Sequence, residues 1–358
     1  MLDKLIEFEM SMGSLCNFQC KYCYENGEGT NFPQTEISQN DLNRWAEYIR
    51  WVKNEILNGA MIKVTIFGGE PTLQLDKITK FIRRIHNVAE IINITTNGSL
   101  PGNSKEELLN LKKYTGTSLN VFVSYDFTNQ NYMRQKDSYE TVRDNIRWLY
   151  HNMGTRRIIT VFTQDNLHTV ADVFFDFIEL RKELPGLICN FNIDRFGVLL
   201  EDFDETPVRK ALSQIKTFID SNPEYKDCFF YNPCVGLKRS ATTDDICFYR
   251  GLFASLNDDG GVYPGYDVTF ETEKVQELLK VGHIQDDFDV LEKRRWELVK
   301  AVDKTPNPQC VECDAPCRVF PWRVIKNDLS EYNNIPEGGH CKVHKLFGEY
   351  IPAPGIKA

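Results

Sequence analysis

The feature that most constrains the fold is a strict alternation of strand-like and helix-like segments over residues 5–221. Short runs rich in apolar and β-branched residues are each followed by apolar residues at helical spacing. The predicted strands cover residues 5–11, 63–67, 91–95, 119–124, 158–162 and 187–193. The predicted helices cover residues 42–56, 74–89, 104–114, 138–153, 169–184 and 206–221. Six such units in register predict an α/β fold of parallel strands with helices outside.

Several helix starts carry residues that favour the cap position. Ser38 is expected to cap the first helix. Ser104 with Glu107 forms the sequence pattern of a capping box. Thr206 followed by Pro207 fits an N-cap and a proline at the first helical position. These residues predict where three of the helices begin.

Composition excludes several classes of partner. The chain of 358 residues has a formal net charge of −9, and general binding to nucleic acid or to an anionic membrane surface favours basic patches instead. The start of the chain lacks a basic region followed by an apolar run, and no stretch of about eighteen apolar residues occurs. We therefore expect a cytoplasmic protein without nucleic-acid or membrane partners. Eleven cysteines in such a compartment indicate metal binding rather than disulfides.

Three cysteines, Cys16, Cys20 and Cys23, follow the first predicted strand in a CxxxCxxC spacing. Thiolates are soft ligands that favour iron–sulfur clusters and zinc. A [4Fe–4S] cube commonly takes four cysteines, so a run of three leaves one iron open for a non-protein ligand. Zinc with a distant fourth ligand fits this spacing as well.

The CxxxCxxC motif, with the aromatic Tyr22 before its third cysteine, resembles that of the radical S-adenosylmethionine (SAM) superfamily. The resemblance implies a partial (β/α)6 barrel whose three cysteines hold a [4Fe–4S] cluster. It also implies that SAM binds the open iron and is cleaved to a 5′-deoxyadenosyl radical, which takes a hydrogen atom from the substrate. Tyr22 would then lie near the adenine of SAM.

Two further motifs of the resemblance follow the second and third strands. Gly68, Gly69 and Glu70 resemble the GGE motif that holds the amino group of SAM, and glycine allows close approach of the backbone. Asn97 belongs to a Thr-Asn-Gly turn that resembles one in the family, although Asn-Gly favours turns by itself. Chemistry is expected at the carboxyl ends of the strands, as in closed barrels.

The fourth strand ends in a motif that resembles the family's SxD pattern. Ser124 and Asp126 would contact the carboxylate or the ribose of SAM. Arg134 resembles an arginine that pairs with the SAM carboxylate in peptide-modifying members, and a guanidinium matches a carboxylate bidentately. A surface arginine at a helix end is the structural alternative.

The pattern changes near residues 222–234, and we expect residues 1–225 to form the barrel and residues 226–358 a cysteine-rich domain. Residues 258–264 predict a β-hairpin that resembles the hairpin of SPASM and twitch domains, which hold auxiliary iron–sulfur clusters. Cys247 and Gly261 fit the first half of that pattern, but Gly265 stands where the hairpin cysteine is expected.

The last cysteines resemble the ligands of a second auxiliary cluster, with a shortened spacing. The expected ligand set for one auxiliary [4Fe–4S] cluster is Cys310, Cys313, Cys317 and Cys341. A structural zinc bound by these four thiolates is the alternative. Cys234 and Cys247 are either inert buried thiols or members of a further site. Asp267 lies one residue from the place of a catalytic aspartate in related enzymes, and the catalytic residue stays unassigned.

The resemblance to the SPASM/twitch subclass, which includes anaerobic sulfatase-maturating enzymes, implies a peptide maturase. Its partners would be a ribosomally made precursor peptide and a flavodoxin- or ferredoxin-type reductant. The first strand begins almost at once, so we expect no separate leader-binding domain before it. A radical SAM dehydrogenase of a small molecule is the second hypothesis. A zinc-stabilised binding protein that makes no radical is the third.

Overall fold

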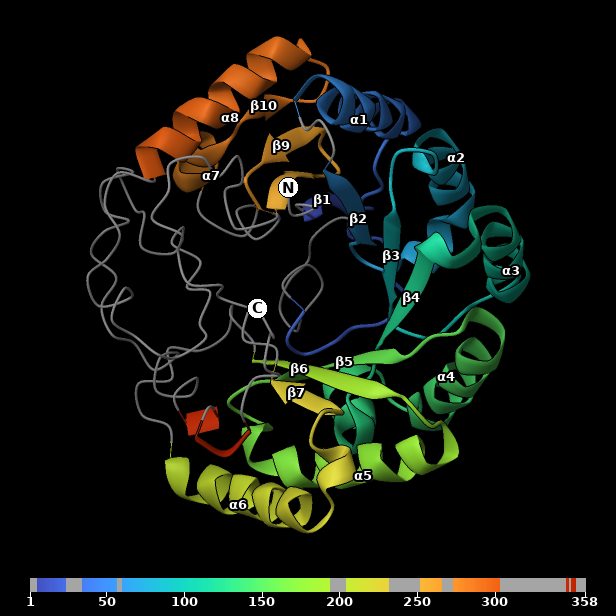
Figure 1. The fold of residues 1–358 in the computed structure, drawn as a ribbon, viewed down its shortest axis with the longest axis vertical. Helices are drawn as coiled ribbons and strands as arrows, with labels where there is room; N and C mark the ends of the chain where they lie inside the picture. Colours follow the sequence, from blue (N-terminus) through green and yellow to red (C-terminus); the bar gives the residue numbers. More distant parts are fainter. Residues whose placement is uncertain are drawn as a thin grey trace.

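The structure is a computed structural model that describes residues 5–23, 34–56, 60–193, 204–231, 252–265, 273–302, 346–347 and 349–351. Seen along the barrel, strands β1 to β7 follow an arc and helices α1 to α6 lie outside it (Figure 1). The strands are β1 (Leu5–Ser11), β2 (Met61–Phe67), β3 (Ile91–Thr96), β4 (Leu119–Ser124), β5 (Arg157–Phe162), β6 (Ile188–Ile193) and β7 (Phe229–Tyr231). The helices are α1 (Gln39–Trp51), α2 (Leu75–Ile85), α3 (Ser104–Thr115), α4 (Tyr139–Met153), α5 (Val170–Glu183) and α6 (Glu205–Ser221).

The predicted partial barrel is confirmed by the strand order. In the described residues one sheet has the order β10-β9-β8-β1-β2-β3-β4-β5-β6-β7, and the pairs from β8 through β7 are all parallel. Alternate residues of β2 and β5 are buried under the helices, and the residues between them face the concave side and are partly exposed. The core therefore lies between the sheet and the outer helices.

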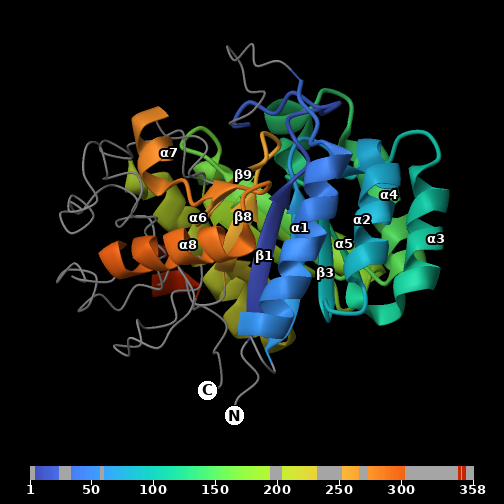
Figure 2. The same cartoon turned by 90° about the horizontal axis from the view of Figure 1, so that it is seen from above.

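The chain after β7 returns to the first strand. The added elements are β8 (Leu252–Leu256), β9 (Gly261–Tyr263), α7 (Glu273–Leu279), β10 (Gly282–His283) and α8 (Phe288–Val302). β8 pairs parallel with β1, while β9 pairs antiparallel with β8, so the predicted hairpin is present and extends the barrel sheet. Helix α8 lies against α1, where Phe288 packs 5.3 Å from the Tyr48 ring (Figure 2). The proposed division at residues 225 and 226 stays a prediction.

Helix starts agree with the sequence only in part. Ser38 caps α1 as predicted, because its side chain accepts a hydrogen bond from the backbone N–H of Asp41. The capping box at Ser104 is wrong, since Ser104 is already helical and its hydroxyl donates to the carbonyls of Pro101 and Thr72.

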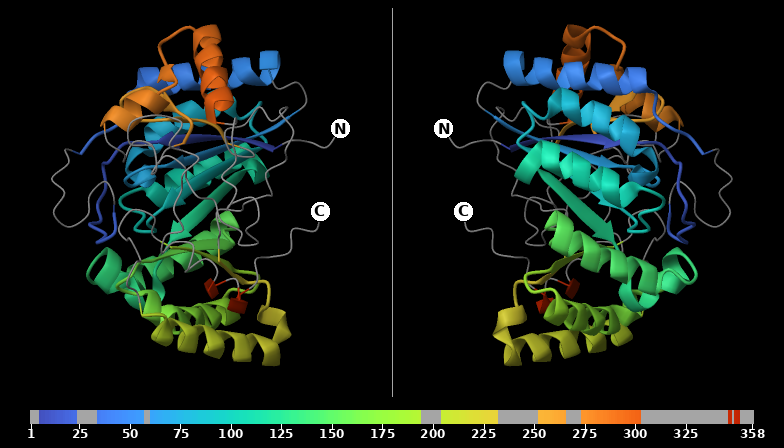
Figure 3. Two further views of the ribbon diagram at one scale, coloured as in Figure 1. Left: turned by 90° about the vertical axis from the view of Figure 1, so that its left-hand side faces the viewer. Right: turned by 90° about the vertical axis from the view of Figure 1, so that its right-hand side faces the viewer.

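The predicted start of α6 is also wrong. Asp204, rather than Thr206, is the N-cap, and its carboxylate accepts from the Thr206 N–H at 2.9 Å. A carboxylate is a charged acceptor that is also favoured at a helix N-terminus. Side views place α1 and α8 at one end of the molecule and α5 and α6 at the other (Figure 3). Among the residues that the structure describes, no helix is both long and apolar enough to cross a membrane.

Candidate radical SAM site

The cysteine loop lies at the carboxyl edge of the barrel, directly after β1. Its backbone is tied to the barrel by Met12, whose N–H donates to the carbonyl of Phe67 at 2.8 Å. Lys21 donates its N–H to the carbonyl of Met133 at 2.8 Å, in the π-helix η5 (Gln130–Arg134). Single π-turns are common at functional sites. These contacts bring the loop after β1 against the turn that follows β4.

All three thiols of the loop are partly exposed and free of disulfides. Burial raises the pKa of Cys16 to about 11 and that of Cys20 to about 12. Cys16 and Cys20 are therefore protonated at neutral pH without metal, and holding a cluster would require their thiolate forms. The Cys16 sulfur already accepts from the Phe18 N–H at 3.4 Å and from Asn97 Nδ2 at 3.8 Å, contacts that also suit a thiolate.

The donor set of the loop fits a cube held by three thiolates. Among the described residues, no three histidine, cysteine, aspartate or glutamate side chains are gathered around one ion-sized position. A cube binds each cysteine through a separate iron, so its thiolates are spread rather than convergent. The three thiols of the loop are still near enough to affect one another's charge. Cys16, Cys20 and Cys23 are the residues that would hold the cluster.

The two glycines after β2 are required by the cysteine loop itself. A Cβ on Gly69 would stand 2.6 Å from the Leu15 carbonyl carbon, and one on Gly68 would stand 2.6 Å from the Met12 nitrogen. The Gly69 N–H also donates to the Gly13 carbonyl at 2.6 Å. Sequence reasoning attributed the glycines to close approach of SAM, whereas here the close neighbour is the chain's own backbone. Contact of either glycine with SAM stays a prediction.

Glu70 is fully buried and joins the ends of β2 and β3. Its Oε1 accepts from the backbone N–H of Thr72 and from the hydroxyls of Thr72 and Thr96, and its Oε2 accepts from the Asn97 N–H at 2.6 Å. Burial raises the pKa of Glu70, while these donors lower it. Oε1 thus accepts three hydrogen bonds and Oε2 only one, so Oε2 keeps a second lone pair that a further donor, such as the amino group of SAM, could use.

The turn after β3 faces the cysteine loop. Asn97 is buried, and its Nδ2 donates to Asn17 Oδ1 at 2.9 Å as well as lying near the Cys16 sulfur. Its Oδ1 accepts from the Ser99 N–H at 2.9 Å. The amide therefore positions the first cysteine, a role that sequence reasoning missed because it depends on which loop lies opposite.

Asp126, like Glu70, is a fully buried carboxylate that accepts four hydrogen bonds. Its Oδ2 accepts from the Tyr22 hydroxyl at 2.5 Å and from Arg134 Nε at 3.0 Å. Its Oδ1 accepts from the Thr160 hydroxyl at 3.1 Å and the Val161 N–H at 3.0 Å. Both oxygens are thus engaged within the protein, and the expected contact with the SAM ribose would require one of these bonds to open.

Arg134 lies between the carboxylate and the cysteine loop. Its guanidinium is 5.6 Å from the centre of the Tyr22 ring, and its side chain is 7% exposed. Burial lowers the pKa of Arg134, but the neighbouring Tyr22, Asp126 and Cys20 together hold it above its usual range. The same guanidinium lowers the pKa of Cys20 against the larger effect of burial. Arg134 is therefore a buried member of the site and not a surface arginine.

The predicted cofactor residues separate into two groups by exposure. Tyr22, Gly68, Gly69 and Ser124 are partly exposed, so a ligand can reach them. Glu70, Asn97, Asp126 and Arg134 are buried and hold that surface in place. The predicted auxiliary ligands Cys310, Cys313, Cys317 and Cys341, with Cys234, Cys247 and Asp267, lie outside the described residues.

The hairpin touches the same edge of the barrel. The Thr35 hydroxyl donates to the Asp258 carboxylate, and Thr35 also receives a hydrogen bond from the Ser14 N–H at 3.1 Å. The hairpin turn is thus linked through Thr35 to the loop that carries the cysteines.

Comparison with a known family agrees with this geometry. Residues 10–177 match the family described as the radical SAM superfamily. This part of the chain is therefore a radical SAM domain, a class that uses a [4Fe–4S] cluster and SAM.

Two curated relatives show how varied such chains are. Radical SAM cyclopropyl synthase TigE of Paramaledivibacter caminithermalis is 22% identical over 213 residues, covering 56% of this chain and 42% of TigE. GTP 3′,8-cyclase of Klebsiella pneumoniae is 27% identical over 183 residues, covering 50% of this chain and 53% of the cyclase. The matched region spans about half or less of each relative.

Solved structures share the fold over nearly the whole chain. The fold is similar to that of anSMEcpe with bound AdoMet, with a TM-score of 0.67 and 18% identity over 96% of both chains. It is also similar to Streptococcus suis SuiB bound to the precursor peptide SuiA, with a TM-score of 0.61 and 15% identity. That match covers 91% of this chain and 74% of SuiB.

Proposed function

We propose that the chain is a radical SAM enzyme that abstracts hydrogen from a peptide, as a maturase of a ribosomally made precursor. When bound, the cluster with SAM supplies a 5′-deoxyadenosyl radical. The observation that carries the proposal is the site itself: three thiols on one loop, tied to the barrel edge by Tyr22 and the buried Asp126–Arg134 pair. Structures of similar fold with bound peptides support a peptide substrate.

The chain's own residues would position and enclose the chemistry. Asn97 and the Phe18 N–H orient the Cys16 sulfur, while Arg134 places positive charge beside Cys20. Gly68, Gly69, Tyr22 and Ser124 line the surface that SAM would contact. The catalytic residue that acts on the substrate stays unassigned.

We further propose one auxiliary [4Fe–4S] cluster, held by Cys310, Cys313, Cys317 and Cys341, and a flavodoxin- or ferredoxin-type reductant in the cytoplasm. Reconstituted protein should then hold about eight irons, from two cubes. Changing Cys310 and Cys313 to Ala should leave about four. A count near twelve would add a third cluster, and a count near four with one zinc would make the second domain a structural zinc site.

The direct test is anaerobic incubation with SAM, a reductant and any short peptide found to be encoded beside the gene, followed by mass spectrometry. A mass change on the peptide, absent with the Cys20→Ala variant, supports the proposal. The second candidate is a small-molecule enzyme, which the similarity to GTP 3′,8-cyclase favours. An unchanged peptide, with 5′-deoxyadenosine formation stimulated by a metabolite mixture, would replace the peptide maturase with that candidate.

A further inference from the structure

The concave face of the sheet is polar, and most of its charges are compensated. Lys63 on β2 pairs with Glu7 on β1 at 2.8 Å, and the Thr65 hydroxyl donates to the same carboxylate at 2.6 Å. Further round the arc, Asn120 donates to Asn93 at 3.1 Å. These side chains alternate with buried ones that face the helices.

Arg157 on the same face lacks such compensation. Its guanidinium lies over the Phe122 ring of β4, 4.9 Å from the ring centre. Within the part of the chain that the structure describes, no carboxylate lies within ion-pair distance of it. Arginine stays charged in proteins, so a partly buried guanidinium without an anion is unfavourable unless a ligand supplies one. Burial lowers the pKa of Arg157, and no neighbouring acid opposes that effect.

The register places Arg157 directly below the predicted cofactor surface. Ser124 pairs with Ile159, and Arg157 lies two residues earlier on β5. Two strand residues span about 7 Å. A substrate group at Arg157 would therefore lie about 7 Å deeper in the barrel than a group presented at Ser124.

A second unsatisfied group lies on the neighbouring strand. Asn192 on β6 pairs with Val161, and alternation along the strand puts its side chain on the concave face. Its Oδ1 is buried and has no hydrogen-bond partner in the structure. A buried acceptor of this kind needs a donor, and the N–H of a peptide backbone is one. Arg157 pairs with Ile188, four residues before Asn192, so the two groups lie about 13 Å apart along the strands, a distance that an extended peptide can span.

We propose that Arg157 is a specificity residue that binds a carboxylate of the substrate inside the barrel. The inference rests on the proposed peptide-modifying function and narrows its substrate class. The carboxylate belongs either to an Asp or Glu side chain or to the C-terminus of the peptide. In both cases the guanidinium binds it bidentately, while the Phe122 ring fixes the plane of the guanidinium.

Protection from phenylglyoxal, mapped by mass spectrometry, tests the inference without activity. Three tripeptide probes distinguish a side-chain carboxylate from a C-terminal one. Acetyl-Ala-Glu-Ala-amide carries only the side-chain carboxylate, acetyl-Ala-Gln-Ala with a free C-terminus carries only the C-terminal one, and acetyl-Ala-Gln-Ala-amide carries neither. Arg156 is the matched control, because it is exposed and stacks on Tyr150, 3.7 Å from the ring centre. At least one carboxylate probe should slow labelling of Arg157 fivefold or more. The neutral probe should not, and Arg156 labelling should not change.

Binding of the same probes, measured by saturation-transfer NMR, completes the test. Arg157→Gln should weaken the preferred carboxylate probe about tenfold or more, to the affinity of the neutral probe. Arg157→Lys should recover part of the loss, and Arg156→Gln should leave all affinities unchanged. The inference is overturned if Arg157 does not react in the free protein, or if neither carboxylate probe protects it. If the protein cleaves no SAM but a carboxylate probe still protects Arg157, the proposed function is wrong and the inference about Arg157 stands.

Discussion

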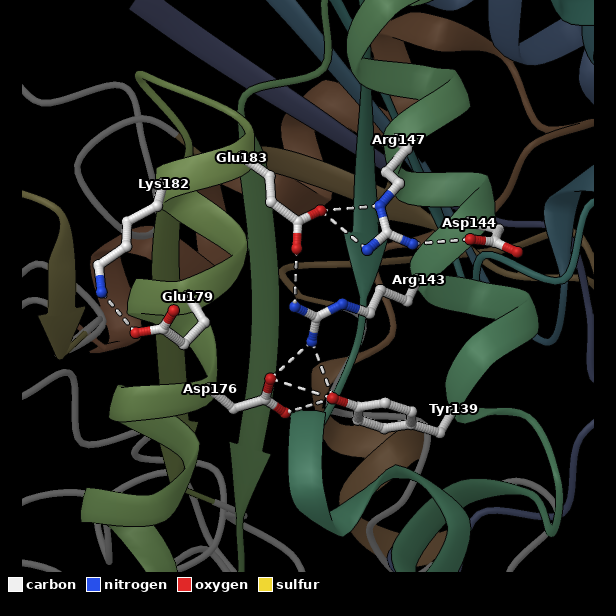
Figure 4. Close-up of polar contacts among 8 residues, drawn as sticks. All are labelled: Tyr139, Arg143, Asp144, Arg147, Asp176, Glu179, Lys182 and Glu183. Carbon is white, nitrogen blue, oxygen red and sulfur yellow. Dashed lines mark hydrogen bonds and ion pairs between the residues drawn. The ribbon is translucent and has the colours of Figure 1, made fainter.

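Two groups of the same three residue types, Arg, Asp and Tyr, occupy different places in this molecule. Arg134, Asp126 and Tyr22 join the barrel edge to the cysteine loop. The other group, Arg143, Asp176 and Tyr139, joins α4 to α5 on the outside of the barrel (Figure 4).

The surroundings of the two groups differ more than their chemistry does. Asp126 is fully buried, whereas the outer group continues through Glu183, with its side chain 44% exposed, to Arg147 at 2.8 Å. The inner guanidinium lowers the pKa of Cys20, while the outer one joins α4 to Asp176 and Glu183 of α5. The comparison teaches that residue type and pairing alone do not mark a functional site. Position at the carboxyl edge and contact with the cysteine loop do.

The largest difference between the groups should come from removing the carboxylate charge. Asp126→Asn leaves Arg134 buried without its anion, and breaking a buried pair costs about 3–5 kcal/mol. We expect that loss in the free energy of unfolding by urea, together with loss of SAM cleavage. Asp176→Asn is the matched control, with about 1–2 kcal/mol lost and cleavage retained. Equal effects of the two variants on cleavage would break the comparison.

The second effect concerns the other anchor of the cysteine loop. Gly69→Ala drives a Cβ into the Leu15 carbonyl group, and we expect about 2 kcal/mol of lost stability with SAM affinity falling as well. The control Gly186→Ala adds a Cβ to open space at φ +84° and should cost about 1 kcal/mol, with affinity unchanged. Thermal unfolding and SAM titration measure both quantities. Weakened SAM binding at unchanged stability would restore the interpretation that the cofactor alone requires this glycine.

Removing single hydroxyls sharpens the comparison further. Tyr22→Phe removes the 2.5 Å hydrogen bond to Asp126 and should cost about 1–2 kcal/mol, with slower 5′-deoxyadenosine formation. Tyr139→Phe should cost about 1 kcal/mol and leave that rate unchanged. Single-turnover kinetics by mass spectrometry give the rates. A slower rate in Tyr139→Phe would mean that the outer group also acts on the site.

The smallest effect on stability is expected for an exposed ion pair on α5, which Figure 4 also shows. Lys182 and Glu179 form an ion pair whose side chains are 54% and 64% exposed. Lys182→Ala should change the free energy of unfolding by less than about 0.5 kcal/mol. A loss above 1 kcal/mol in urea unfolding would show that the outer group extends further than its exposure indicates.

The sequence predicted the barrel well because strand–helix alternation is a local signal. The cysteine spacing and the GGE, Thr-Asn-Gly and SxD motifs are local as well, and all fall at strand ends. The failure at Thr206 is also local, since the neighbouring Asp204 caps the helix, whereas the Ser104 hydroxyl donates to the Pro101 and Thr72 carbonyls instead of capping.

The rest depends on which strand ends become neighbours. Glu70 accepts hydrogen bonds from Thr96 and Asn97 only because β2 lies beside β3. Asp126 accepts from Tyr22 only because the cysteine loop packs against the turn after β4. The pairing of β8 with β1 could not be predicted either, because regular alternation had ended before it. The sequence could not predict that Arg157 has no carboxylate partner among the described residues, because this depends on which side chains the neighbouring strands place beside it.

The most direct test of the account is SAM cleavage by anaerobically reconstituted protein, with 5′-deoxyadenosine measured by mass spectrometry. The account predicts its formation with SAM and dithionite by the unchanged chain. It predicts none by Cys16→Ala, Cys20→Ala or Cys23→Ala, each still folded by circular dichroism. Cleavage retained in any of the three variants, or a colourless zinc-containing protein that cleaves no SAM, would contradict it.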